Sequence, residues 1–233
     1  MLMCEPREDI IARMPKASKS PLPPRLPAAR GLRRLAHVAL EDDAAFADAE
    51  ILGRTGAGAA RKVSLERVVV RGADLTGTRL DRLTVTDARL QNCDLANAVW
   101  RGAAIDRTEL IGCRVTGLDV AEMTANNVVV RDCVVNLASF RFATLKRVTF
   151  EGCTLTESDF QDATLVDTVF HRCDLTAAVF YGATVAGVDL RGSTLEDLRI
   201  RAGDLAGAVI DPVQLVTLAR TLASLAGIVV RDA

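Results

Sequence analysis

Apolar residues recur at every fifth position of this chain from Leu65 to Ile210. All 30 positions of the series are apolar, and only Ala125 among them is small. Two residues before each of these centres lies a second series of mostly small apolar residues, typified by Ala73, Ala88, Cys93, Ala143, Cys153, Ala163 and Ala183. Since apolar residues make up only 49% of the chain, a series of this length requires a structural cause.

The alternating spacing of two and three residues fits neither a helix of period 3.6 nor a long strand of period 2. It predicts a chain that runs extended for three residues and then turns a corner. Two residues after the centres, between Arg67 and Gly207, Gly, Asn or Asp fills 18 of 29 positions. These residue types favour turns because they tolerate positive φ or bond to their own backbone.

A second, longer period gives the number of sides. Cysteines and phenylalanines recur at every twentieth position, as Cys93, Cys113, Cys133, Cys153 and Cys173, and as Phe140, Phe160 and Phe180. This interval is four pentapeptides, so each coil is predicted to have four sides, with like residues stacked on like. Coils about 4.8 Å apart then build a rod of roughly 36 Å from about 7.4 coils.

The stretches Ala73-Asp74-Leu75, Cys93-Asp94-Leu95 and Cys173-Asp174-Leu175 resemble the pentapeptide-repeat family, and the resemblance covers residues 63–211. It implies an all-β fold, a right-handed quadrilateral β-helix of about seven coils. The handedness comes from the resemblance, because the spacing alone does not fix it. Most of the family has no established role, so the resemblance is far more specific for fold than for function.

Four segments are predicted along the chain. Residues 1–43 are a basic arm, mobile or docked, that holds six of the seven prolines, the last of them Pro27. Residues 44–62 are a degenerate first coil or N-cap, residues 63–211 form the β-helix, and residues 212–233 form a helix and a short strand.

The C-terminal segment begins with Asp211-Pro212, an N-cap followed by proline at the first helical position. An apolar stripe follows, with Leu215, Leu218, Leu222 and Leu225, and residues 228–230 are expected as the strand. The bare end of a solenoid needs a cap, so capping is one role of this helix. Dimerisation is the other, because mycobacterial gyrase-binding relatives are similar here, with Asp-Pro-Val and a dimerising C-terminal segment.

Charge restricts the partners of the protein. The 29 basic and 30 acidic residues give a net charge of −1, whereas proteins that coat nucleic acid or anionic membranes need a basic excess. We therefore expect neither direct nucleic-acid binding nor membrane binding. The absence of a long apolar stretch and of a secretory signal favours a cytoplasmic location.

No motif for catalysis, metal binding or cofactor binding stands out. The cysteine column is interpreted as small buried apolar residues, since zinc ligands converge on a point and do not form a line. His171 follows the centre Phe170 and is expected to point outward. The sequence therefore predicts a non-enzymatic protein without a cofactor.

Two candidate surfaces for a protein partner remain. The window 148–171 has no Lys or Arg and contains an acidic belt, Glu151, Glu157, Asp159, Asp162 and Asp167. Apolar residues at outward positions within about one coil form a candidate apolar contact, Val129, Val134, Leu137 and Phe142. Each has an ordinary alternative, a solvated surface or tolerated β-formers.

The main functional prediction is binding of a protein through the outer faces. A more specific alternative comes from the resemblance, because acidic rods of some family members mimic DNA, bind gyrase and protect it from quinolones. This rod is only weakly acidic in comparison. A purely structural spacer is the third alternative.

Overall fold

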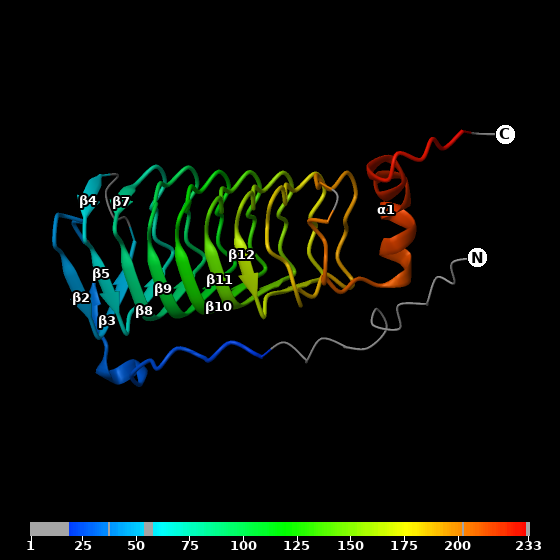
Figure 1. The fold of residues 1–233 in the computed structure, drawn as a ribbon. Helices are drawn as coiled ribbons and strands as arrows, with labels where there is room; N and C mark the ends of the chain where they lie inside the picture. Colours follow the sequence, from blue (N-terminus) through cyan, green and yellow to red (C-terminus); the bar gives the residue numbers. More distant parts are fainter. Residues whose placement is uncertain (1–18, 37, 54–57, 202, 232–233) are drawn as a thin grey trace, which may run out of the picture.

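The computed structural model describes residues 19–36, 38–53, 58–201 and 203–231. They form an elongated rod of stacked coils with one helix across its C-terminal end (Figure 1). The beginning of the predicted arm, 1–18, lies outside the described residues. The strands are β1 (Arg33–Leu35), β2 (Ala45–Ala47), β3 (Ala49–Leu52), β4 (Ala59–Arg61), β5 (Ser64–Glu66), β6 (Val69–Arg71), β7 (Arg79–Asp81), β8 (Thr84–Gln91), β9 (Ala104–Ile111), β10 (Thr124–Arg131), β11 (Thr144–Glu151), β12 (Thr164–Val166) and β13 (Val169–His171).

Neighbouring coils pair in parallel, with each residue beside its equivalent four pentapeptides later. Val85 lies beside Ile105, Ile105 beside Ala125 and Ala125 beside Leu145, through β8, β9, β10 and β11. Single bridges with the same shift continue the pairing on the sides without long strands, up to Asp189 with Val209. The protein is thus a parallel β-solenoid of about seven turns, which confirms the predicted fold class.

Each coil has four sides, named here by the centres of one coil. Leu145 lies on side 1, Phe150 on side 2, Leu155 on side 3 and Phe160 on side 4, and residues paired between neighbouring coils share a side. The residue two positions after each centre forms a corner. At all 28 described corners from Arg67 to Gly207 this residue has a positive φ, whether it is Gly, Asn and Asp or Arg, Glu and Leu. The coil geometry therefore imposes the positive φ at the corner. Gly, Asn and Asp adopt this conformation at a lower energetic cost than other residues.

The core is built from the two predicted apolar series. All 30 centres are buried except Leu110, Leu205 and Ile210, which are partly buried. Phenylalanine rings stack on their equivalents one coil away, with centroids 4.8 Å apart between Phe140 and Phe160 and between Phe160 and Phe180. The five cysteines of the column are buried, as expected.

The first coil deviates from the regular register. Phe46 in β2 pairs with Leu65 in β5, and Ile51 in β3 pairs with Val70 in β6, one position short of the shift seen between later coils. Leu35 in β1 pairs with Ile51, a shorter shift still. The degenerate segment 44–62 is thus a shortened coil. The strand β1 lies within the range predicted as the arm, so part of that range joins the sheet.

The helix α1 (Pro212–Leu225) closes the opposite end. Asp211 is its N-cap and forms a reciprocal capping box with Gln214, whose side chain also donates to the carbonyls of Leu190 and Ser193, both at 2.6 Å. Leu218 is 1% exposed and covers the last coil. The short strand predicted after the helix is wrong: residues 228–230 form no strand, because the last coil edge they would extend is covered by α1.

The core is less completely filled where the centres are small. An apolar cavity of about 60 Å³ runs beside Ala125 and is otherwise lined by larger side chains such as Ile105, Val115, Val120 and Met123. Replacing Ala125 by Val adds two methyl groups to this space. We expect Ala125→Val to raise the free energy of unfolding by about 1 kcal/mol, because cavity filling recovers lost contacts.

Urea unfolding monitored by circular dichroism measures this change. Ala163→Val is the matched control, since Ala163 is 1% exposed beside the stacked phenylalanines and lines no described cavity. Overpacking there is expected to lower the stability by about 1–3 kcal/mol. Equal destabilisation by both substitutions would contradict the assignment of the cavity.

Candidate functional site

The residues of the predicted acidic belt lie on different sides of the rod. Every fifth position brings the backbone to the next corner, so a window such as 151–167 wraps around the axis. Glu151 belongs to side 2 and Asp159 to side 4. Glu157, Asp162 and Asp167 occupy three different corners, each with positive φ. The structure therefore does not bring the five carboxylates onto one face.

Two of these carboxylates are engaged by arginines. Glu151 accepts hydrogen bonds from Arg131 on the preceding coil and from Arg172, both at 2.8 Å. Arg131 lowers the pKa of Glu151 below its ordinary value, and Arg172 adds to the shift. Asp159 lies 3.4 Å from Arg141. The local charge at these two positions is thus largely compensated.

The predicted apolar contact is dispersed in the same way. Val129 lies on side 2 and is half-buried, and Val134 lies on side 3. Leu137 and Phe142 are 57% and 54% exposed at two different corners, with φ of 60° and 58°. A positive φ is unfavourable for large apolar residues. At an exposed position, no burial of the side chain offsets this cost. These positions remain candidates for a contact, but not for one shared patch.

An acidic face does exist, and it runs along the rod instead of around it. We call it the acidic side: the outward residues of side 3 with those of its corner toward side 4. Between residues 74 and 197 it carries one arginine, Arg114, and six carboxylates, Asp74, Asp94, Glu157, Asp174, Glu196 and Asp197. Of the predicted belt only Glu157 belongs to it. Sorting the charges by the period of one full coil would have found this side.

The other sides carry both signs, and one corner alternates. Along the corner between sides 1 and 2 the residues are Arg67, Asp87, Arg107, Asn127, Arg147 and Asp167, all with positive φ. Arg107 donates to both carboxylate oxygens of Asp87, at 2.6 and 2.8 Å. These hydrogen bonds hold the pKa of Asp87 below its usual range, and the backbone N–H of Arg25 lowers it further. We call this corner the charge ladder, because arginines alternate with Asp or Asn along it.

The five thiols of the cysteine column face inward. The neighbouring thiol of Cys113 and burial both raise the pKa of Cys93 above its ordinary value, which keeps this thiol protonated. Within the described part of the chain, no group of three or more His, Cys, Asp or Glu side chains is placed to hold a metal ion. His171 points outward, as predicted.

The leucines of the predicted helix stripe divide between two environments. Leu218 is buried, and Leu222 and Leu225, 36% and 37% exposed, border an apolar groove of about 450 Å³ over the last coil. Leu215 is 53% exposed, and Val213 and Val216 are each 76% exposed. The helix caps the rod and still presents apolar side chains to solvent. Among the described residues, no helix has the length and apolar character to span a bilayer.

Comparison with known proteins identifies the repeat. A family model described as a pentapeptide repeat region matches four overlapping segments, 83–160, 103–180, 127–200 and 143–219, which together span more than half of the chain. The chain belongs to the pentapeptide repeat family. No curated protein matches this pentapeptide repeat protein.

Some solved structures are similar to this chain. A trypsin-treated variant of QnrB1, a plasmid-mediated fluoroquinolone resistance protein, aligns with a TM-score of 0.50 and 20% identity over 84% of this chain and 99% of the other. A second trypsin-treated QnrB1 variant aligns with a TM-score of 0.48 and 23% identity. The alignment covers 85% of this chain and 99% of the other. The pentapeptide repeat protein Rfr23 from the cyanobacterium Cyanothece 51142 aligns with a TM-score of 0.19 and 16% identity, over 62% and 88%. At 20% identity, the likeness to the variant with a TM-score of 0.50 concerns the fold alone.

The charge ladder predicts an acid-dependent stability. A carboxyl whose pKa is lowered by folding stabilises the protein above its unfolded pKa, about 3.9 for Asp, and this contribution is lost as the pH falls through the lower folded value. We expect Arg107→Gln to lower the free energy of unfolding by about 1–2 kcal/mol at pH 7. The difference from the wild type should shrink below about pH 4.

Urea titrations at pH 7, 5 and 3 measure this difference. Arg101→Gln serves as the control, since the Arg101 side chain is 66% exposed in its pair with Asp119 and should contribute under about 0.5 kcal/mol. A deficit of Arg107→Gln that stays constant from pH 7 to 3 would show that the ion pair is not its cause.

Proposed function

We propose that this protein acts by binding another protein through the acidic side, and that it does so without catalysis. The supporting observation is the uneven distribution of charge, with six carboxylates and one arginine on one long face of a rod whose other faces carry both signs. A face of one sign attracts a basic partner surface and speeds its association. The burial of the five thiols in the cysteine column supports a binding role over a catalytic one.

A basic surface built for DNA is the partner that this geometry fits best. The acidic side presents about one carboxylate per 5 Å of rod, compared with one phosphate per about 3.4 Å along a DNA strand. A straight, rigid array of this kind can occupy a DNA-binding surface, with weaker electrostatic attraction than DNA itself. We therefore propose a type II topoisomerase such as DNA gyrase as the partner. The QnrB1-like fold is compatible with this choice.

A supercoiling assay with purified bacterial DNA gyrase, with and without a fluoroquinolone, tests the proposal. We expect the wild type to inhibit supercoiling or to reduce drug-stabilised cleavage at micromolar concentration. Glu157→Gln/Glu196→Gln/Asp197→Asn removes half of the carboxylates of the acidic side and should raise the required concentration at least fivefold. The effect of the wild type should weaken with added salt.

The matched control removes the same charge elsewhere. Asp81→Asn/Glu122→Gln/Asp162→Asn changes side 4 and its corner with side 1, and includes one member of the predicted belt. It should behave like the wild type. Equal loss in both triple variants would show that net charge, and not the acidic side, matters. Full activity of the first variant would contradict the site, and no effect of the wild type would contradict gyrase as the partner.

We also propose that two copies associate through α1. Val213, Leu215 and Val216 are at least half exposed at the N-terminal end of the helix. Leu215→Lys/Val216→Lys should convert a dimer to a monomer in size-exclusion chromatography with light scattering. Thr217→Lys, a polar exposed neighbour, should leave the mass unchanged. A monomeric wild type would contradict the dimer.

A further inference from the structure

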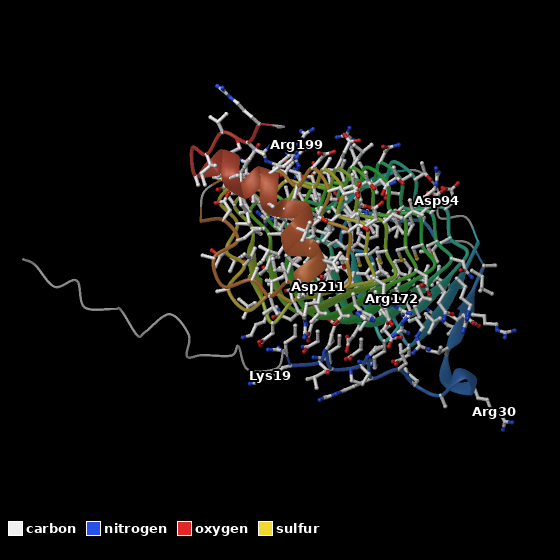
Figure 2. All side chains as sticks on the ribbon, turned by 90° about the vertical axis from the view of Figure 1, so that its right-hand side faces the viewer. Lys19, Arg30, Asp94, Arg172, Arg199 and Asp211 are labelled. Atoms are coloured by element: carbon white, nitrogen blue, oxygen red, sulfur yellow. The ribbon has the colours of Figure 1, made fainter. Side chains whose placement is uncertain are left out.

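The described part of the N-terminal arm lies along the corner between sides 1 and 2. Figure 1 shows this segment running beside β8–β11 toward the first coil, and Figure 2 shows it, from Lys19 to Arg30, at the lower edge of the rod. We call residues 19–28 the polyproline arm. Its contacts with the corner are made by the backbone: the N–H of Arg25 donates to Asp87 at 2.9 Å, and that of Leu22 donates to Asn127 at 3.4 Å.

The spacing of these two contacts matches a polyproline II helix. Asp87 and Asn127 are two coils apart, about 9.6 Å at about 4.8 Å per coil. Leu22 and Arg25 are three residues apart, about 9.3 Å at the polyproline II rise of about 3.1 Å per residue. One full turn of the arm therefore spans two coils of the rod. Ala28, with φ −57° and ψ 146°, has the backbone conformation of this helix.

The proline positions follow the same three-residue period. Pro21, Pro24 and Pro27 occupy one face of the arm. The face that includes the two donors has no proline at residues 19, 22, 25 and 28. Proline lacks a backbone N–H. It can therefore occupy any face of the arm except the face whose N–H groups donate hydrogen bonds to the corner. The sequence thus fixes the polyproline II backbone while it keeps the donors that the corner uses.

The corner supplies acceptors at the matching interval. Its charge ladder alternates arginine with Asp or Asn, so a side-chain oxygen recurs every second coil, at Asp87, Asn127 and Asp167. Arg147 donates to the same oxygen of Asn127 at 2.7 Å, and the Asn127 amide donates to Asp106 at 2.9 Å, which orients it. Asp87 and Asn127 point outward from the rod and are nonetheless only 7% and 5% exposed.

We propose that this corner is a binding site for polyproline II segments that carry a free N–H at every third residue, and that the chain's own arm is its resident ligand. The tether gives the arm a high effective concentration at the site. The arm therefore excludes other proline-rich segments of the same chemistry until it is displaced. The site lies across the rod from the acidic side, where Asp94 marks the opposite edge in Figure 2, and the inference does not rest on the proposed function.

Substitution of the donors by proline separates recognition from conformation. In the full chain, Leu22→Pro/Arg25→Pro preserves the polyproline II backbone and removes both donated hydrogens. A fluorescent peptide of residues 18–30 should then bind the variant at least tenfold more tightly than the wild type, measured by anisotropy. The same peptide with both prolines should bind neither protein. Equal binding of the wild-type peptide to both proteins, or binding to neither, would overturn the proposal.

Hydrogen exchange provides a second test that does not depend on folding of the double-proline variant. The amides of Leu22 and Arg25 should exchange at least tenfold more slowly than those of Ser20 and Leu26. Asn127→Ala should remove the protection of Leu22. Asn97→Ala is its matched control, because Asn97 has nearly the same φ, 55° against 54°, at a corner across the rod. Uniform exchange along the arm would refute the site.

Discussion

The structure depends on one constraint, that each residue lies on its equivalent four pentapeptides later in the chain. Parallel backbone pairing at this shift runs from β5 to the last coil. Inside the rod it stacks like on like, so phenylalanine rings lie 4.8 Å apart and thiols form a column. Outside, the same stacking would set like charges side by side, which is unfavourable. Alternation of sign, as at Asp87 and Arg107, relieves this repulsion.

Side 3 and its corner toward side 4 depart from the alternation. Asp74 and Asp94 are consecutive in one column, and Glu196 and Asp197 are adjacent on the last coil, while Arg114 is the one basic residue of the face. Arg114 forms an ion pair with Asp94, and like charges close together on one face are unfavourable for stability. The acidic side therefore has a negative electrostatic field. Such a field extends further into solvent than the field of paired charges. This difference separates a candidate binding face from an ordinary solvated one.

The sequence predicts the features that recur in every coil. Centres, corners, four sides and the Asp211–Pro212 helix start follow from local chemistry, and all are observed. The predicted acidic belt does not form one face in the structure. Residues close in sequence, such as Glu151 and Glu157, lie on different sides of the rod axis. Positive φ at Leu137 or Arg147 was not predictable from residue type, since the coil imposes it. The contact between Leu22 and Asn127 joins distant parts of the chain. To predict it, the three-residue period of the arm has to be compared with the two-coil spacing of acceptors along the corner.

The arm and the acidic side have different physical requirements and can be separated by experiment. The arm binds through backbone donors at a fixed spacing, with prolines that reduce the entropy lost on docking. Such recognition depends on geometry and only weakly on salt. The acidic side acts through charge and is screened by salt within about 10 Å. Since the two lie on opposite parts of a rigid rod, displacement of the arm would leave the acidic side unchanged. A partner that senses both would have to wrap around the rod or carry a proline-rich segment beside a basic surface.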